Sequence, residues 1–127
     1  MASSKTINQI QLLLAERFPQ REKPRKIGGK PITFIPWYET IAIMNGCADG
    51  CYDYEIIEKG HSPISNKFEM TVRVTIHASD GTYYREGTGI EDSSTDNFGD
   101  YQSNAESMAL RRALAKFNLG IYIYRKG

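Results

Sequence analysis

Cysteine and histidine are scarce in this sequence, and the few present are poorly spaced for a metal site. Its 127 residues include two cysteines and two histidines. Cys47 and Cys51 stand at positions i and i+4, a spacing that fits neither a zinc knuckle nor a redox Cys-x-x-Cys pair. His61 and His77 are the only further soft ligands, and they lie far apart in the chain. We therefore expect reduced thiols and no bound metal.

The sequence also lacks a long apolar run. No segment approaches the roughly 20 apolar residues that cross a bilayer, and the opening MASSKTINQ has no signal-peptide core. We expect a soluble, intracellular protein, cytoplasmic in a bacterium or in a phage-infected cell. An organellar or nuclear location stays open.

Motifs for fuel use and covalent catalysis are missing as well. The sequence has no G-x-x-x-x-G-K-[ST] loop for a triphosphate, and Gly87-Thr88-Gly89 lacks the third glycine of a dinucleotide fingerprint. Nothing in it resembles a nucleophile elbow. We expect a binding protein without a cofactor rather than an enzyme. One enzymatic alternative is a Mg²⁺-dependent nuclease, with the carboxylates of Glu91, Asp92, Asp96 and Asp100 around the ion.

The small net charge of +1 conceals a segregated distribution. Two stretches are rich in cations, one near the start of the chain and one at its end. Between Glu86 and Glu106, in contrast, every charged side chain is acidic. A surface divided in this way suits binding or head-to-tail self-association. The two basic blocks are Arg17, Arg21, Lys23, Arg25, Lys26 and Lys30, and then Arg111, Arg112, Lys116, Arg125 and Lys126.

The length of the chain suits one domain with a single core. Helical spacing of apolar residues predicts a helix within residues 1–18, ended by Pro19. Residues 19–31 are predicted to form a basic, glycine-containing loop without regular structure, because proline and glycine recur there. Residues 32–127 are predicted to form an α+β core.

Inside this core the pattern changes from strand to helix and back. A short strand at 32–35 is followed by a helix that opens at Pro36 and is closed by Gly46 and the nearby Asp49-Gly50. Strands are predicted at 52–59, 69–78 and 82–88, and the turn at 79–81 makes the last two a hairpin. The expected fold is α+β, an antiparallel sheet with a long C-terminal helix packed across one face.

The stretch from Ser103 to Tyr124 carries the strongest helical signal. Ser103 and Glu106 have the spacing of a capping box, which predicts that a helix begins at Ser103. Asn118 or Gly120 can end it in the left-handed conformation. Helical spacing separates an apolar face, Leu110, Ala113, Leu114 and Phe117, from a basic face, Arg111, Arg112 and Lys116.

Two features suggest that this basic helix face meets a ligand. Ala105 and Ala109 lie beside the cations, so a ligand could approach the helix backbone closely. Most aromatic residues have core-compatible spacing, but Phe34 directly follows the basic glycine loop and is the preferred stacking residue. A merely solvated basic face is the competing interpretation.

Several segments, in a fixed order, carry a family resemblance. They are Arg25-Lys26-Ile27-Gly28-Gly29-Lys30, Thr33-Phe34-Ile35, Asp80-Gly81-Thr82-Tyr83, Gly87-Thr88-Gly89 and residues 106–124. Together they resemble the Rad52-type single-strand annealing family over residues 18–124, and bacterial and phage members, including DdrA-like damage-response proteins, look closest. The chain departs from the eukaryotic pattern at Ala115, where a further arginine is usual.

The resemblance implies an annealing core that assembles side by side into rings or open arcs, with DNA in an outer groove. It implies that Arg111 and Arg112 contact single-strand phosphates and that Lys116 is the candidate replacement for the absent arginine. It also implies a contact from the basic residues ahead of the glycine loop, Arg25 or Lys26, with Lys30 as a neighbour.

The leading hypothesis is ATP-independent binding of single-stranded DNA and annealing of complementary strands in recombination and double-strand break repair. The alternatives are a protein that protects DNA or its ends without annealing, the nuclease, and a purely structural self-assembling module. Predicted partners are single-stranded DNA and further copies of the chain, with no membrane. A recombinase or a single-strand-binding protein stays open as a partner.

Overall fold

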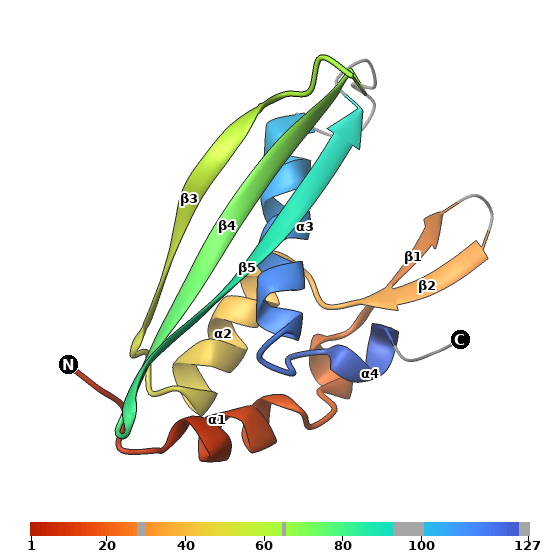
Figure 1. Cartoon of the computed structure of the whole chain (residues 1–127). Helices are drawn as coiled ribbons and strands as arrows, with labels where there is room; N and C mark the ends of the chain where they lie inside the picture. The colour runs from red at the N-terminus through yellow and green to blue at the C-terminus, as the bar shows by residue number, and fades with distance from the viewer. Residues whose placement is uncertain (28–29, 65, 93–100, 125–127) are drawn as a thin grey trace.

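The computed structural model describes residues 1–27, 30–64, 66–92 and 101–124, and of 25–27, 30–32 and 124 it describes the backbone alone. The fold is α+β, as predicted. In Figure 1 a three-stranded sheet forms one layer, and helix α3 lies across one of its faces. Helices α1 and α2 pack near one end of the sheet, and a separate two-stranded hairpin projects to the side. None of the described helices has an apolar stretch long enough to cross a bilayer.

The main sheet is antiparallel and follows chain order. Its strands are β3 (Tyr52–His61), β4 (Lys67–Ala78) and β5 (Gly81–Asp92), with β4 in the centre. Along β4, buried side chains alternate with half-exposed ones, because only one face of the sheet is covered by helices. Ala78 pairs with Gly81, which confirms the predicted hairpin. The predicted strands are correct but too short at their ends.

Helix α3 (Tyr101–Ala115) begins two residues before Ser103, so the prediction that Ser103 caps it is wrong. The ring of Tyr101 packs edge-on against Phe68, with centroids 5.2 Å apart, and against His61, with centroids 5.7 Å apart. These contacts stabilise a helical turn upstream of the position that local capping favours. Tertiary packing has therefore overridden the capping signal.

The end of α3 matches its prediction. Asn118 has a φ of 81° and Gly120 a φ of 70°, both in the left-handed region. The N–H of Leu119 donates to the carbonyl of Leu114 at 3.1 Å, and that of Asn118 donates to Ala115 at 2.9 Å. These two bonds form a Schellman motif, and the buried Leu119 and Leu114 provide its apolar contact. The chain then turns into the short helix α4 (Ile121–Tyr124).

The N-terminal helix α1 (Ile7–Leu14) is shorter than predicted and is followed by a 3₁₀ turn at Pro19–Arg21. Thr6 caps it, because the Thr6 side chain accepts from the N–H of Gln9 and the Gln9 side chain accepts in return from the N–H of Thr6. The carboxylate of Asp80 also accepts from the N–H of Ile7 at 3.0 Å, which ties α1 to the β4–β5 turn.

Helix α2 (Trp37–Cys47) begins one residue after the predicted Pro36, which stands at the N-cap instead of in the first turn. It continues through Gly46, so this glycine does not close it. The left-handed residues Asp49, with φ 56°, and Gly50, with φ 70°, make the turn that follows. The predicted reduced thiols agree with Cys47 and Cys51, which are both free.

The prediction of an irregular loop at 19–31 is wrong. Strands β1 (Lys23–Ile27) and β2 (Lys30–Phe34) pair as an antiparallel hairpin, with Lys23 opposite Phe34 and Ile27 opposite Lys30. Proline is tolerated here because each strand of a two-stranded ribbon is an edge strand, with half of its N–H groups outside the ladder. The proline and glycine content of this segment argues against a strand inside a sheet, but it does not argue against a two-stranded ribbon.

Helix α3 lies unusually close to β5. A Cβ atom at Gly89 would stand 2.0 Å from the carbonyl oxygen of Ala105, and one at Gly87 would stand 2.4 Å from that of Ala109. Ala105, Ala109 and Ala113 are fully buried against these glycines. The small glycine and alanine residues therefore allow the backbones of α3 and β5 to pack in direct contact. The prediction that Ala105 and Ala109 leave room for a ligand is wrong.

Candidate nucleic-acid interface

The C-terminal half of α3 carries the basic residues, and its buried side fixes their direction. Leu110, Ala113, Leu114 and Phe117 are all buried, as predicted, and belong to the main core. The Schellman turn holds the last helical residues in place. The basic residues therefore project from a rigid support rather than from a loop.

Arg111 brings the late helix to the end of the N-terminal hairpin. Its guanidinium carbon lies 5.5 Å from the centroid of the Phe34 ring, within range of a cation–π contact. Phe34 is the last residue of β2 and is half-buried. Two predicted site residues from distant parts of the sequence thus lie together.

Arg112 points in another direction, toward the main sheet. Its Nη1 donates to the carbonyl oxygen of Thr88 in β5 at 2.7 Å, and its side chain is exposed. One turn earlier, the thioether of Met108 accepts from the N–H of Ile90 at 3.4 Å. These two side chains satisfy backbone groups of the β5 edge strand. The side chains of the adjacent Arg111 and Arg112 therefore point in different directions, one toward Phe34 and one toward β5.

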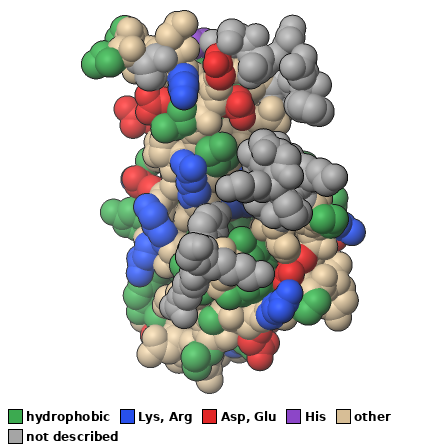
Figure 2. Space-filling view, turned by 90° about the vertical axis from the view of Figure 1, so that its right-hand side faces the viewer, with side chains coloured by type: hydrophobic (Ala, Val, Ile, Leu, Met, Phe, Trp, Pro, Cys, Tyr) green, Lys and Arg blue, Asp and Glu red, His purple; other side chains and the backbone are tan. Residues whose placement is uncertain are grey.

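Lys116 is exposed one turn beyond Arg112, on the same side of the helix. Figure 2 shows the side of the molecule toward which the β1–β2 hairpin projects, where Lys and Arg side chains gather at mid-height near apolar side chains. Cationic and apolar side chains therefore share this face, a combination suited to contacts with phosphates and bases.

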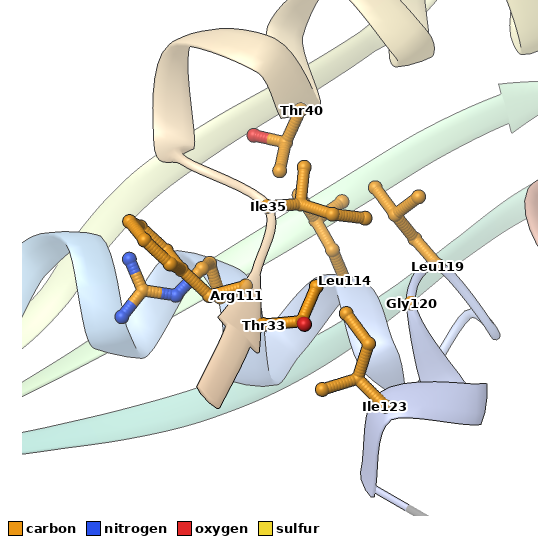
Figure 3. Close-up of a pocket in the computed structure, with 9 residues that line it drawn as sticks. Thr33, Ile35, Thr40, Arg111, Leu114, Leu119, Gly120 and Ile123 are labelled. Atoms are coloured by element: carbon orange, nitrogen blue, oxygen red, sulfur yellow. The ribbon is translucent and has the colours of Figure 1, made fainter. Parts of the chain in front are cut away.

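An apolar hollow of about 170 Å³ lies beside Arg111 and Phe34. The end of β2, the start of α2 and the segment after α3 surround it, and its lining includes Ile35, Leu119 and Ile123. Figure 3 shows the Arg111 guanidinium pointing away from Leu119 and Ile123. The charged group thus stands at the margin of the hollow and faces outward.

The fold and this basic helix can be compared with known protein families. The family described as "Rad52/22 family double-strand break repair protein" matches residues 6–127. The chain belongs to the Rad52/22 family. The predicted family is therefore confirmed, whereas the narrower likeness to bacterial and phage DdrA-like members stays a prediction.

Two relatives in Arabidopsis thaliana support the family. The chain is 36% identical over 98 residues to "DNA repair RAD52-like protein 1, mitochondrial", covering 77% of this chain and 55% of the relative. It is 36% identical over 93 residues to "DNA repair RAD52-like protein 2, chloroplastic", covering 73% of this chain and 46% of the relative. The chain thus spans about half the length of the curated relatives it matches.

In this Rad52-family chain two members of the first basic block, Arg17 and Arg21, are paired with carboxylates. The guanidinium of Arg17 lies 3.2 Å from Glu22, and that of Arg21 lies 2.8 Å from Glu39. The Tyr122 hydroxyl also donates to Glu22, and burial, followed by this bond, raises the pKa of Tyr122. Arg17 and Arg21 are therefore occupied in joining the N-terminal segment to α2 and α4. They are poor candidates for DNA contacts.

The predicted contacts Arg25, Lys26 and Lys30 have side chains outside the described residues. Their backbones lie in the β1–β2 hairpin, so all three belong to an extended ribbon and not to a loop. Whether they contact DNA stays a prediction.

The metal and nuclease expectations concern a different part of the chain. Within the described ranges, no three His, Cys, Asp or Glu side chains come together as possible metal ligands. Glu91 and Asp92 end β5, but Asp96 and Asp100 lie outside the described residues. The nuclease alternative stays a prediction.

Sequence reasoning missed Arg85. Its guanidinium carbon lies 5.2 Å from the ring centroid of Phe117, and its Nη1 donates to the carbonyl of Tyr84 at 2.7 Å. A signal was present, because strand alternation puts Arg85 on the same face as Gly87 and Gly89, the face on which α3 rests.

Proposed function

We propose that this Rad52-family chain binds single-stranded DNA and anneals complementary strands without ATP, in recombination and double-strand break repair. The observation that carries the proposal is the placement of Arg111 and Arg112 on the rigid end of α3. One guanidinium lies beside Phe34 and the other at the edge of β5. Family membership supplies the DNA-repair context.

The proposed mechanism follows from charge and stacking. Arginine and lysine side chains neutralise phosphates, so two strands can approach each other with less repulsion. Phe34 provides a half-buried aromatic surface next to Arg111, suited to stacking without sequence preference. The edges of the bases stay available for pairing. Base pairing then provides the driving force, which explains why no fuel is required.

We further propose that copies of the chain associate side by side. Among the described residues, β3 pairs only with β4, so its outer edge has unpaired backbone groups. Tyr54, Ile56 and Ile57 on this strand are each more than a third exposed. An exposed apolar edge strand favours association with another protein surface. Side-by-side subunits would extend the cationic surface along a DNA strand, as a closed ring or an open arc.

Fluorescence anisotropy with labelled single-stranded oligonucleotides tests the binding part of this proposal. Arg111→Ala combined with Arg112→Ala is compared with Arg73→Ala, a control on the opposite face of the sheet whose guanidinium pairs with Glu86. The account predicts weaker binding to every sequence and a shallower salt dependence for the double variant only. Equal binding by all three proteins would contradict it.

Light scattering of the free protein tests self-association, and a monomer at all concentrations would contradict that part.

A further inference from the structure

The described Lys and Arg side chains differ in whether a nearby carboxylate neutralises their charge. Four of them have a carboxylate oxygen within 3.2 Å, whereas Arg85, Arg112 and Lys116, and likewise Lys23, Lys59 and Lys67, have none within the ion-pair limit among the described residues. Arg85 and Arg112 instead donate to backbone carbonyls, which leave their net charge uncompensated. The four compensated cations are Lys5, Arg17, Arg21 and Arg73.

Arg85 is held in one direction by its surroundings. It lies opposite Val74 in the ladder, so its side chain leaves β5 on the face covered by α3. At Gly87 and Gly89 the helix presses on this face, but at Arg85 the helix has already ended, and the guanidinium lies over Phe117. The Tyr84 carbonyl uses one donor. A guanidinium has five N–H donors, so most remain available to a ligand.

Three of these cations, Arg85, Arg112 and Lys116, border the line of contact between α3 and β5. Arg112 bonds Thr88, three residues along β5 from Arg85, which corresponds to about 10 Å of strand. Lys116 lies one helical turn, about 6 Å, beyond Arg112 and next to Phe117, the residue that Arg85 covers. We call this surface, made of Arg85, Arg112 and Lys116, the α3–β5 seam.

We propose that Arg85 is a further phosphate contact and that the single strand follows the α3–β5 seam. This inference rests on the proposed function, because it assigns a residue and a path to the same binding activity. Arg85 contributes from the strand side, opposite the cations of α3. Its stacking on Phe117 orders the guanidinium before DNA arrives, which reduces the entropy lost on binding.

The test compares two changes at Arg85 with a matched control. Arg85→Gln removes the charge and keeps a planar polar group near Phe117, whereas Arg85→Lys keeps the charge. Arg73→Gln is the control, since Arg73 also stacks on an aromatic ring, that of Tyr84 at 4.6 Å, but is paired with Glu86. Each protein is titrated with single-stranded oligonucleotides at several salt concentrations, after thermal unfolding has been recorded.

Affinity falls as salt rises. The proposal predicts that Arg85→Gln makes the slope of log affinity against log salt less steep, by about 0.7 for each subunit in contact. Arg85→Lys and Arg73→Gln should keep the wild-type slope. An unchanged slope in Arg85→Gln would overturn the proposal, as would equal loss of binding and of thermal stability in both Arg85 variants. If the wild type does not bind DNA at all, the proposed function itself fails. If binding depends on Arg111 and Arg112 but not on Arg85, only this inference fails.

Discussion

The close packing of α3 on β5 predicts that replacing Gly89 with alanine destabilises the protein. Replacing this glycine with alanine puts a Cβ atom 2.0 Å from the carbonyl oxygen of Ala105, where ordinary contact begins at 3.4 Å. The same atom would stand 2.9 Å from the backbone nitrogen of Ala109. All of these neighbours are backbone atoms of one helix, so no side chain can rotate away. The helix must move outward by more than 1 Å.

The expected cost follows from two opposing effects. Overpacking of a tight core typically costs about 1 to 3 kcal/mol, and a backbone clash belongs at the upper end of that range. Alanine recovers about 0.5 to 1 kcal/mol relative to glycine within a strand, because the unfolded chain loses less entropy. We therefore expect Gly89→Ala to lower the free energy of unfolding by about 2 kcal/mol.

Urea unfolding followed by circular dichroism measures this change. The predicted loss shifts the midpoint downward by about 1 M at an unchanged m-value, for an m-value of about 2 kcal/mol/M. Gly46→Ala is the matched control. Gly46 lies inside α2, and nothing stands within 4 Å of an added Cβ, so this change should stabilise the protein by about 0.5 to 1 kcal/mol. A Gly89→Ala protein as stable as the wild type would refute the close seating of α3.

Three further predictions concern stability. Phe117 is fully buried, so Phe117→Ala should cost about 3 to 5 kcal/mol in urea unfolding. Asn118 is left-handed, so Asn118→Ala should cost about 1 to 2 kcal/mol, whereas Asn118→Gly should not destabilise. The Ser3 hydroxyl, followed by Lys5, lowers the pKa of Asp49 from its ordinary 3.8. That stabilisation is complete above the ordinary value and disappears as pH falls through the lowered one. Asp49→Asn should therefore reduce the acid dependence of the thermal midpoint, and an unchanged pH profile would contradict this role.

Local patterns predicted the parts of the fold that depend on local chemistry. The alternation of β4 and the turn before Gly81 were sufficient for the central hairpin, since register there follows from the buried face and a short turn. The left-handed end of α3 was predictable because few residues other than glycine and asparagine adopt that conformation easily. These signals do not depend on distant contacts.

The predictions failed where contacts between residues distant in the sequence determine the local structure. The start of α3 is set by the packing of Tyr101 on Phe68, which lies far away in the sequence. The predicted strand at 32–35 overlaps β2, but β1 and its pairing with β2 were missed, because proline rules for interior strands do not apply to a ribbon with two edges. The small residues Ala105 and Gly89 each appeared locally to make space, but together they remove it.

The sequence predicted the site residues on α3 but did not predict Arg85 on β5. The basic residues on α3 follow directly from helical spacing, whereas the approach of Arg111 to Phe34 joins segments that are distant in the sequence. The divergence of Arg111 and Arg112 and the position of Arg85 depend on how α3 crosses β5. That crossing is a property of the packed sheet, which one-dimensional patterns do not contain.

The central claim, annealing through the end of α3, is tested most directly by the rate at which two complementary labelled oligonucleotides pair. Energy transfer is followed in buffer without ATP or Mg²⁺, with wild type, the Arg111→Ala and Arg112→Ala double variant, and the Arg73→Ala control. The account predicts acceleration by the wild type and the control, and none by the double variant. Wild-type protein that binds both strands without accelerating their pairing, or a double variant as fast as the wild type, would contradict it.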